Sequence, residues 1–216
     1  MSKFRYIMWD WNGTLLDDLK ANFETINKLL TDRSLPPMKS LDEYRGLFGF
    51  PVIDFYEKTG FDLENERFED IAKDYVREYY SRFFECELFF EAEKILRYIL
   101  ASGREQLIVS ATEQESLLKQ VEEFGIDHLF TEILGMSDIY ARSKVQLAER
   151  WMKENGIKAE DVLFIGDTTH DYEVAKSIGC SCVLIPSGHN SKERLQLTVA
   201  TVLQSIAEIK NYLEEN

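Results

Sequence analysis

The sequence has no long hydrophobic run, few cysteines and a shortage of basic residues. A membrane-spanning helix needs about 20 consecutive apolar residues, and no stretch of the chain approaches that length. The apolar segment after the N-terminal residues is short and ends in Asp10, which argues against a signal peptide. We therefore expect no membrane partner.

The cysteine content excludes a disulfide framework and a cysteine metal site. The three cysteines are Cys86, Cys180 and Cys182, and they form no Cys-x-x-Cys pair. Cys180 and Cys182 flank one serine, so in a strand their side chains share a face. We expect buried free thiols and hence a reducing, cytoplasmic location.

Acidic residues outnumber basic ones, 39 to 25, and the formal net charge is −14. Such a chain has no general basic surface for nucleic-acid phosphates, so nucleic acid is not an expected partner. The acidic residues are spread over helical stretches and are not gathered in one tail. They indicate solvated helix faces, with a few carboxylates reserved for a cation.

Short apolar runs alternate with helical patterns along most of the chain. The four runs that predict buried strands are Arg5–Asp10, Gln106–Ser110, Val162–Asp167 and Ser181–Pro186. A fifth strand is expected around His128–Leu134. The helical patterns between and after these runs are Glu113–Phe124, Lys144–Asn155, Tyr172–Ile178 and Thr201–Leu213. This alternation predicts an α/β fold with a doubly wound, Rossmann-like parallel sheet.

The segment between the first two strands breaks this alternation. Residues 16–88 contain no convincing strand and predict the helices Leu19–Thr31, Leu41–Leu47, Val52–Thr59 and Glu66–Phe84. We therefore expect a core formed by residues 1–15 and 89–216, with residues 16–88 inserted as a helical subdomain. The chain has 216 residues and 44% hydrophobic content, enough for one substantial core with an insertion.

The ends of the predicted strands carry polar residues with complementary chemistry. They are Asp10, Ser110 and Asp167, with Asp171 close behind and Lys144 at the start of a helix. The carboxyl ends of parallel strands meet at one edge of a sheet, where open α/β folds bind ligands. Carboxylates, a hydroxyl and a lysine in one place suit Mg²⁺ together with a phosphate group.

Four motifs in this order resemble the haloacid dehalogenase-like hydrolase superfamily: DWNGT, LIVSA, Lys144 and GDTTHD. The helical insertion is similar to the C1-type cap of that family, and the pattern is most similar to its phosphoglycolate phosphatase-like members. The resemblance implies a phosphatase for a small phosphorylated metabolite, with Asp10 as the nucleophile that forms an aspartyl-phosphate. It implies Mg²⁺ held by Asp10, the Asn12 backbone carbonyl and Asp167, with Asp171 behind them or acting through water.

The same resemblance implies a phosphate site made of Ser110, Lys144 and the backbone N–H groups around Gly13 and Ala111. Each of these residues taken alone has an ordinary alternative role. Ser110 could begin a helix, Lys144 could lie on the surface, and Asp167 and Asp171 could be helix caps. The order and spacing of the four motifs favour the site.

Asn12 departs from the family pattern, which has aspartate there as the acid and base of the reaction. An amide cannot exchange a proton in that way. Three explanations are open: His170 replaces the carboxylate, the chain binds phosphates or transfers them slowly, or the Asn12–Gly13 pair deamidates to aspartate. The chain is therefore expected to be a phosphatase with reduced turnover or, alternatively, a weak or inactive member that binds a phosphorylated ligand or protein partner. A receiver domain, which also phosphorylates an aspartate, is disfavoured because it needs no helical insertion.

Three further residues are candidates for substrate contact, each with an ordinary alternative. Trp11 is expected to point out of the nucleophile turn, Arg45 lies on a predicted loop of the cap, and His170 lies beside the second acidic motif. Their alternatives are a core tryptophan, a surface arginine and a solvent-exposed histidine. His189 follows the last strand on a loop that could approach the edge of the site.

Overall fold

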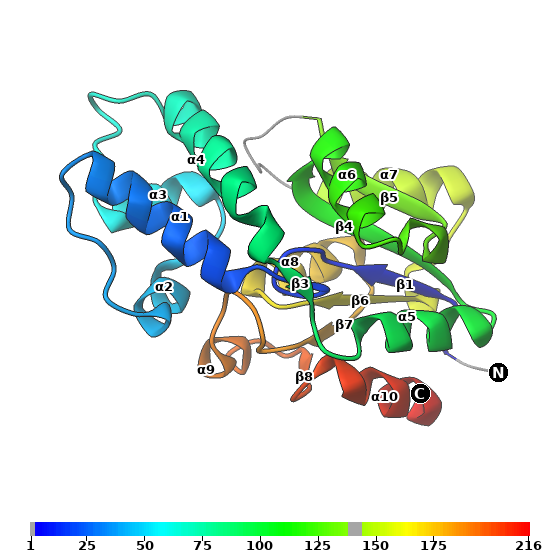
Figure 1. Cartoon of the computed structure of the whole chain (residues 1–216). Helices are drawn as coiled ribbons and strands as arrows, with labels where there is room; N and C mark the ends of the chain where they lie inside the picture. Colours follow the sequence, from blue (N-terminus) through cyan, green and yellow to red (C-terminus); the bar gives the residue numbers. More distant parts are fainter. Residues whose placement is uncertain (1–2, 138–143) are drawn as a thin grey trace.

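A computed structural model of the chain describes residues 3–137 and 144–216 (Figure 1). Six strands form one parallel sheet in the order β5-β4-β1-β6-β7-β8. The strands are β1 (Tyr6–Trp9), β4 (Glu105–Glu113), β5 (Glu132–Met136), β6 (Val162–Gly166), β7 (Ser181–Leu184) and β8 (Thr201–Val202). The predicted α/β class with a parallel sheet is confirmed.

The central strand β1 is buried along its whole length between β4 and β6. Trp9 pairs with Ile108 on one side and Ile165 on the other, so β1 and β6 end at nearly the same level while β4 continues to Glu113. These strands are apolar on both faces because helices cover both sides of a parallel sheet. Asp10 therefore lies at the carboxyl edge of the sheet, directly after a fully buried strand.

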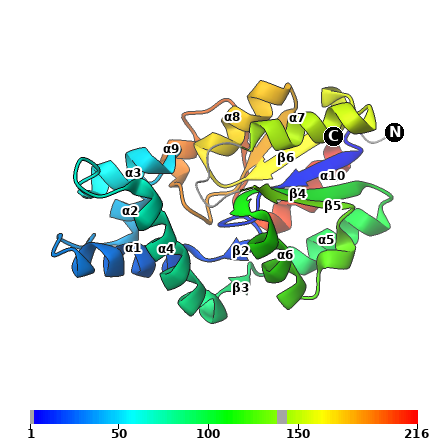
Figure 2. The ribbon, with the colours of Figure 1, turned by 90° about the horizontal axis from the view of Figure 1, so that it is seen from above.

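Helices cover the two faces of the sheet (Figure 2). Alternate strand residues such as Ile7 and Ile108 pack on one face with α5, α6 and α10, while Met8 and Phe164 pack on the other with α7 and α8. These helices are α5 (Ala92–Ala101), α6 (Gln114–Glu123), α7 (Val145–Asn155), α8 (Thr169–Ile178) and α10 (Ile209–Glu215), and the short α9 (Lys192–Leu195) follows β7.

Four of the helices between β1 and β4 form a separate group beside the sheet (Figure 1). They are α1 (Leu19–Asp32), α2 (Leu41–Leu47), α3 (Val52–Thr59) and α4 (Phe68–Arg82). They share their own apolar core, which includes Leu30, Tyr44, Phe55 and Ile71. The chain segments just before and just after this group form a short antiparallel pair, β2 (Leu16–Asp17) with β3 (Glu87–Leu88). Within the described residues, no helix has both the length and the apolar character that crossing a bilayer requires.

Three local expectations differ from the structure. The helix expected over Thr201–Leu213 starts as strand β8, because two β-branched residues pair with β7, and helical turns follow only from Ile206 and Ile209. Helix α5 was missing from the expected elements. The fifth strand lies at Glu132–Met136, after a 3₁₀ turn at Asp127–Leu129, and so begins later than expected.

The sequence pattern also does not predict the pair β2–β3. Each strand has two residues, which is too short to show the alternation that predicts a strand. Their partners stand far apart in the sequence, Leu16 with Leu88 and Asp17 with Glu87. This pairing lies at the two boundaries expected for the helical insertion.

Candidate active site

Asp10 stands at the base of the site and is held in one orientation. Its backbone N–H donates to the carbonyl of Ile165 at 2.8 Å, which extends the ladder between β1 and β6. Its Oδ1 accepts from the N–H of Trp11 at 2.8 Å and faces Lys144 Nζ at 2.8 Å. Asp10 is buried, so its carboxylate has been taken out of bulk water and fixed by a cation and a backbone dipole.

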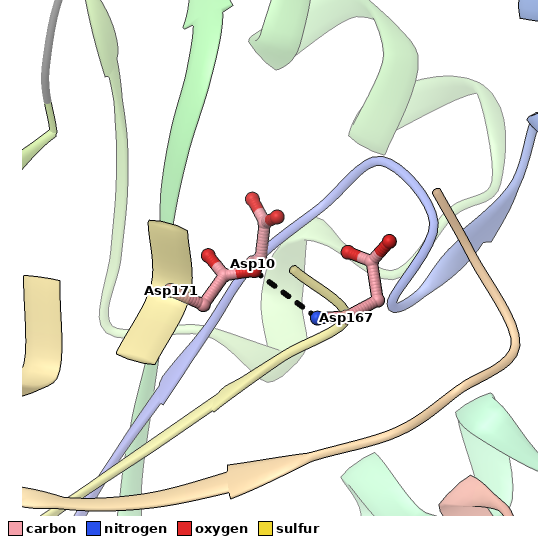
Figure 3. A group of neighbouring side chains, drawn as sticks. All are labelled: Asp10, Asp167 and Asp171. Atoms are coloured by element: carbon pink, nitrogen blue, oxygen red, sulfur yellow. Dashed lines mark hydrogen bonds between the residues drawn. The ribbon is translucent and has the colours of Figure 1, made fainter. Parts of the chain in front are cut away.

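Two more carboxylates come within reach of Asp10 (Figure 3). Asp167 follows β6, and Asp171 lies in the first turn of α8; one oxygen from each of the three lies within 4.8 Å of the others. Asp171 forms a capping box with Thr168, whose N–H donates to its Oδ2 at 2.9 Å. Its Oδ1 lies 2.5 Å from Lys144 Nζ. Asp171 therefore fixes the lysine and the start of the helix.

The charges of this cluster do not balance within the described residues. Burial and the neighbouring Asp171 raise the pKa of Asp10 to about 8, against the opposing pull of Lys144. Burial raises the pKa of Asp167 to about 6, although His189 acts in the other direction. Burial disfavours the Lys144 ammonium, but Asp10 and Asp171 outweigh it and raise the pKa of the lysine. Three buried carboxylates around one lysine form a site that fits a divalent cation with oxygen ligands.

Asn12 uses both ends of its amide. Its Nδ2 donates to Asp18 Oδ2 at 2.7 Å and to the Tyr79 hydroxyl at 3.2 Å, and its Oδ1 accepts from Thr112 Oγ1 at 2.7 Å. The side chain is thus bound by α4, by the β4 end and by the loop before α1. An ionised aspartate here would have no hydrogen to donate to Asp18.

Only glycine suits position 13, because the backbone there is left-handed and there is no room for a Cβ. Its φ of +73° lies in the left-handed region, and an added Cβ would lie 2.6 Å from His189 Cδ2 and closer still to Asp167 Oδ2. Its N–H donates to the carbonyl of Leu16 at 2.8 Å and to Asp18 Oδ1 at 3.0 Å. The predicted phosphate contact of the Gly13 N–H therefore competes with two internal hydrogen bonds.

Asp18 is fully buried and accepts hydrogen bonds from several residues around the site. It was not among the site residues expected from the sequence. Besides Gly13 and Asn12, it accepts from Asn22 Nδ2 at 2.7 Å and from the Tyr79 hydroxyl at 2.8 Å. Burial raises the pKa of Asp18, but the hydrogen bonds and the charge of His189 outweigh it, so the pKa is lowered overall. Asp18 is therefore ionised, and α1 and α4 both bind it.

His189 is the partner of Asp18 from the other side of the site. Its Nε2 lies 3.3 Å from Asp18 Oδ1, its Nδ1 lies 3.0 Å from the Tyr44 hydroxyl, and its backbone N–H donates to Asp167 Oδ2 at 2.6 Å. Burial lowers its pKa, but Asp18 outweighs burial and raises it to about 9. The sequence signal for this pair was slight: a second aspartate directly after Asp17, and a histidine on the loop after the β7 strand.

The remaining predicted phosphate residues lie at the same edge. Ser110 is buried on β4, where its Oγ accepts from the Thr112 N–H at 3.1 Å, and Ser110 and Ala111 both border the cleft next to Asp10. Thr14, which was not among the predicted residues, donates to Asp167 Oδ1 at 3.0 Å. The structure thus brings together the ends of β1, β4 and β6 as the motif order predicts.

The three predicted substrate contacts lie outside the cleft lining. Trp11 is fully buried in the core and donates from Nε1 to Gln120 at 2.8 Å. Arg45 donates to the carbonyls of Gly188 at 2.9 Å and Ser187 at 3.1 Å, so it joins α2 to the loop after β7. His170 stacks on Phe50, with ring centroids 4.5 Å apart, and burial lowers its pKa. Substrate contact by these residues stays a prediction.

A cleft opens above Asp10 between the sheet edge and helices α1–α4. It encloses about 1100 Å³, the solvent at its mouth included. Asp10, Ser110 and Lys144 form one end of its lining, and most of the rest is aromatic or aliphatic. The greater part of these apolar residues comes from α2, α3 and α4. We call this space the cleft.

Comparison with known proteins assigns the family. The model of the haloacid dehalogenase-like hydrolases matches residues 7–185, which span β1 to the end of β7. The chain belongs to this hydrolase family. The resemblance drawn from the four motifs is thereby confirmed.

Curated relatives and solved structures agree with this family. The chain is 23% identical over 196 residues to a phosphoglycolate phosphatase of Pseudomonas savastanoi pv. phaseolicola, covering 86% of this chain and 71% of that protein. It is 25% identical over 199 residues to one of Haemophilus influenzae, covering 88% of each. A predicted phosphatase of Clostridium acetobutylicum shares the fold with a TM-score of 0.84 at 23% identity over 100% of both chains. The family protein SP0104 of Streptococcus pneumoniae does so with 0.85 at 20% identity, covering 98% of this chain and 99% of that one.

Proposed function

We propose that this protein is a Mg²⁺-dependent phosphomonoesterase that hydrolyses a small phosphorylated molecule through a phosphorylated Asp10. The observation that carries this proposal is the arrangement at the base of the cleft. Asp10 Oδ1 is held by Lys144 and by the N–H of Trp11, which leaves Oδ2 as the attacking oxygen. A fixed carboxylate beside a buried lysine suits attack on phosphorus, because positioning and charge stabilisation supply most of the catalysis in phosphoryl transfer.

The surrounding residues would hold the phosphoryl group. Lys144 would balance its charge, and the Ser110 hydroxyl would donate a hydrogen bond to one of its oxygens. Both side chains are buried at the cleft base, so these interactions are stronger than in water. Asp171 keeps Lys144 in place from behind and takes no direct part in this step.

The acidic cluster fits Mg²⁺. Asp10, Asp167 and the backbone carbonyl of Asn12 would hold the ion, with Asp171 acting indirectly because its oxygens already accept from Thr168 and contact Lys144. When bound, Mg²⁺ neutralises charge on the transferring phosphoryl group and orients it. The surplus of buried carboxylates over Lys144 gives the cation its affinity.

The helical segment 16–88 is proposed to be a cap that closes the cleft during the reaction. Closure would exclude water and surround the part of the substrate that leaves. Asn12 cannot supply or take up the proton that an acid or base would transfer, so turnover should fall most for esters with poor leaving groups.

Asn12 also supports a second candidate function, the binding of a phosphorylated ligand without turnover. Its amide is satisfied by Asp18 and Thr112, so the structure is built for an amide at this position. In that case the site would bind the phosphate group without hydrolysing the ester.

Hydrolysis of acetyl phosphate separates the two candidates. Its leaving group needs no proton, so an enzyme with an intact nucleophile and no acid should still cleave it. We expect Mg²⁺-dependent release of phosphate that EDTA stops and that Asp10→Asn abolishes, with a phosphoryl group trapped on the peptide containing Asp10. Binding of phosphate without any release of product would reject the enzyme.

A further inference from the structure

We propose that the substrates are aryl phosphates, monoesters of phenols whose only charged group is the phosphoryl group. This inference rests on the proposed phosphatase function and adds the identity of the leaving group. Three observations carry it: the aromatic lining of the cleft, the pairing of the basic side chains in it, and the amide at position 12.

The cleft offers rings beyond the phosphate end. Phe48 and Phe50 border it from the loop between α2 and α3, and Phe55 borders it from α3. Tyr75, Tyr79 and Tyr80 border it from α4. Several of these rings already contact one another; Phe48 and Phe55 meet edge-to-face with centroids 5.3 Å apart. A flat aromatic group would extend this arrangement, because aromatic rings gain from such contacts beyond the burial of apolar area.

No basic side chain in the described lining is free to receive a second negative charge. Among residues 3–137 and 144–216, the lining contains two basic side chains, Lys144 and His189. Lys144 pairs with Asp10 and Asp171, and His189 pairs with Asp18. A carboxylate on the substrate would be placed among rings without a partner, which costs free energy. The lining therefore disfavours phosphoglycolate and favours an uncharged organic group.

The amide of Asn12 selects for the leaving group. A phenol has a pKa of about 10, as in tyrosine, so a phenolate can depart without a proton. An alkyl alcohol resembles water, with a pKa near 15.7, and its alkoxide leaves only with help from an acid. Asn12 gives no such help, so an aryl ester is the class of monoester that this site can cleave without it.

The reaction balances without another reactant. Asp10 Oδ2 forms a bond to phosphorus while the bond from phosphorus to the phenol oxygen breaks, and its electron pair stays on that oxygen. The phenolate then takes a proton from water. A second water attacks phosphorus, the bond to Asp10 breaks, and its proton goes to the phosphate released.

A series of small esters tests the proposal. Phenyl phosphate and benzyl phosphate present the same ring but leave as a phenol and an alcohol, and 4-carboxyphenyl phosphate adds one charge to the phenol. We expect kcat/KM for phenyl phosphate to exceed that for benzyl phosphate by about 100-fold or more, the range in which acid catalysis acts. The 4-carboxyphenyl ester should be at least roughly tenfold poorer than the phenyl ester. Values for benzyl phosphate or 2-phosphoglycolate that match phenyl phosphate would overturn the proposal.

Matched variants test the cleft itself. Phe50→Ala should lower the ratio of kcat/KM for phenyl phosphate over acetyl phosphate by about tenfold, because the ring loses a partner. Phe84→Ala removes the same side chain from an exposed site outside the lining and should leave this ratio unchanged. An equal ratio in both variants would reject the aromatic subsite. Failure to cleave acetyl phosphate would instead reject the phosphatase, so the two failures are distinguishable.

Discussion

Replacing Asn12 with aspartate, the residue that the family pattern has there, should destabilise this protein. The new carboxylate would take the place of a partly buried amide nitrogen 2.7 Å from Oδ2 of the fully buried Asp18. Two unit charges about 4 Å apart repel by about 4 kcal/mol at the effective dielectric constant of about 20 that suits proteins. The protein can avoid this repulsion by keeping one proton on the pair.

Retaining the proton lowers the unfolding free energy by a similar amount. A carboxyl group with an ordinary pKa of about 3.9 that must stay protonated near pH 7 costs about 4 kcal/mol, at 1.36 kcal/mol per pH unit. Repulsion between the two carboxylates raises the pKa of the folded pair above its unfolded value. The penalty in unfolding free energy therefore grows as the pH rises and falls to roughly 1.5 kcal/mol near pH 5. Loss of the hydrogen bond from Asn12 adds to the penalty, and the charge of His189 offsets part of it.

Urea unfolding of metal-free protein in EDTA measures this penalty. Asn12→Asp should lose about 3 to 5 kcal/mol near pH 7 and much less near pH 5. The double variant Asn12→Asp with Asp18→Asn exchanges the two groups and should recover at least half of the loss. A single variant as stable as the wild type near pH 7, or a loss that does not shrink near pH 5, would refute the reasoning.

Three further outcomes are expected. Lys144→Met leaves two buried carboxylates without their cation, which should cost about 3 to 5 kcal/mol of unfolding free energy in EDTA, and added Mg²⁺ should restore part of it. Gly13→Ala forces a Cβ against Asp167 at a left-handed φ, so Mg²⁺ affinity measured by calorimetry should fall, while Gly46→Ala, at a glycine with open space, should bind as before. His189 with a pKa near 9 in the folded state and 6.5 unfolded contributes about 3 kcal/mol, fully present below pH 6.5 and lost as the pH rises through 9. The stability difference between the wild type and His189→Gln, measured in EDTA, should therefore shrink over that range, and a constant difference would contradict the assignment.

The fold and the acidic edge could be predicted because their signals are local. Asp10 and Asp167 each follow a short apolar run, and the end of a buried strand is recognisable without its neighbours. Parallel pairing then places both ends at one edge, which is where the structure has them.

The network around Asp18 could not be predicted because its contacts are distant in the sequence. His189 stands on a loop beyond β7, and Tyr79 lies on α4, so no periodic pattern links either one to Asp18. Their association depends on how α1–α4 pack beside the sheet. Arg45 illustrates the same limit, since its donation to the carbonyls of Ser187 and Gly188 depends on how helix α2 lies against the loop after β7.

The antiparallel pair β2–β3 means that the helical segment is inserted where a hairpin turn would otherwise stand. Leu16 and Leu88 are cross-strand neighbours, so both ends of the insertion meet at the spacing of a β-ladder, about 5 Å between Cα atoms. The connection of the insertion to the core is therefore fixed by β2 and β3, whatever sequence lies between them. An insertion of different length could join the same two ends without a change of register in the main sheet, because the β2–β3 pair is separate from that sheet.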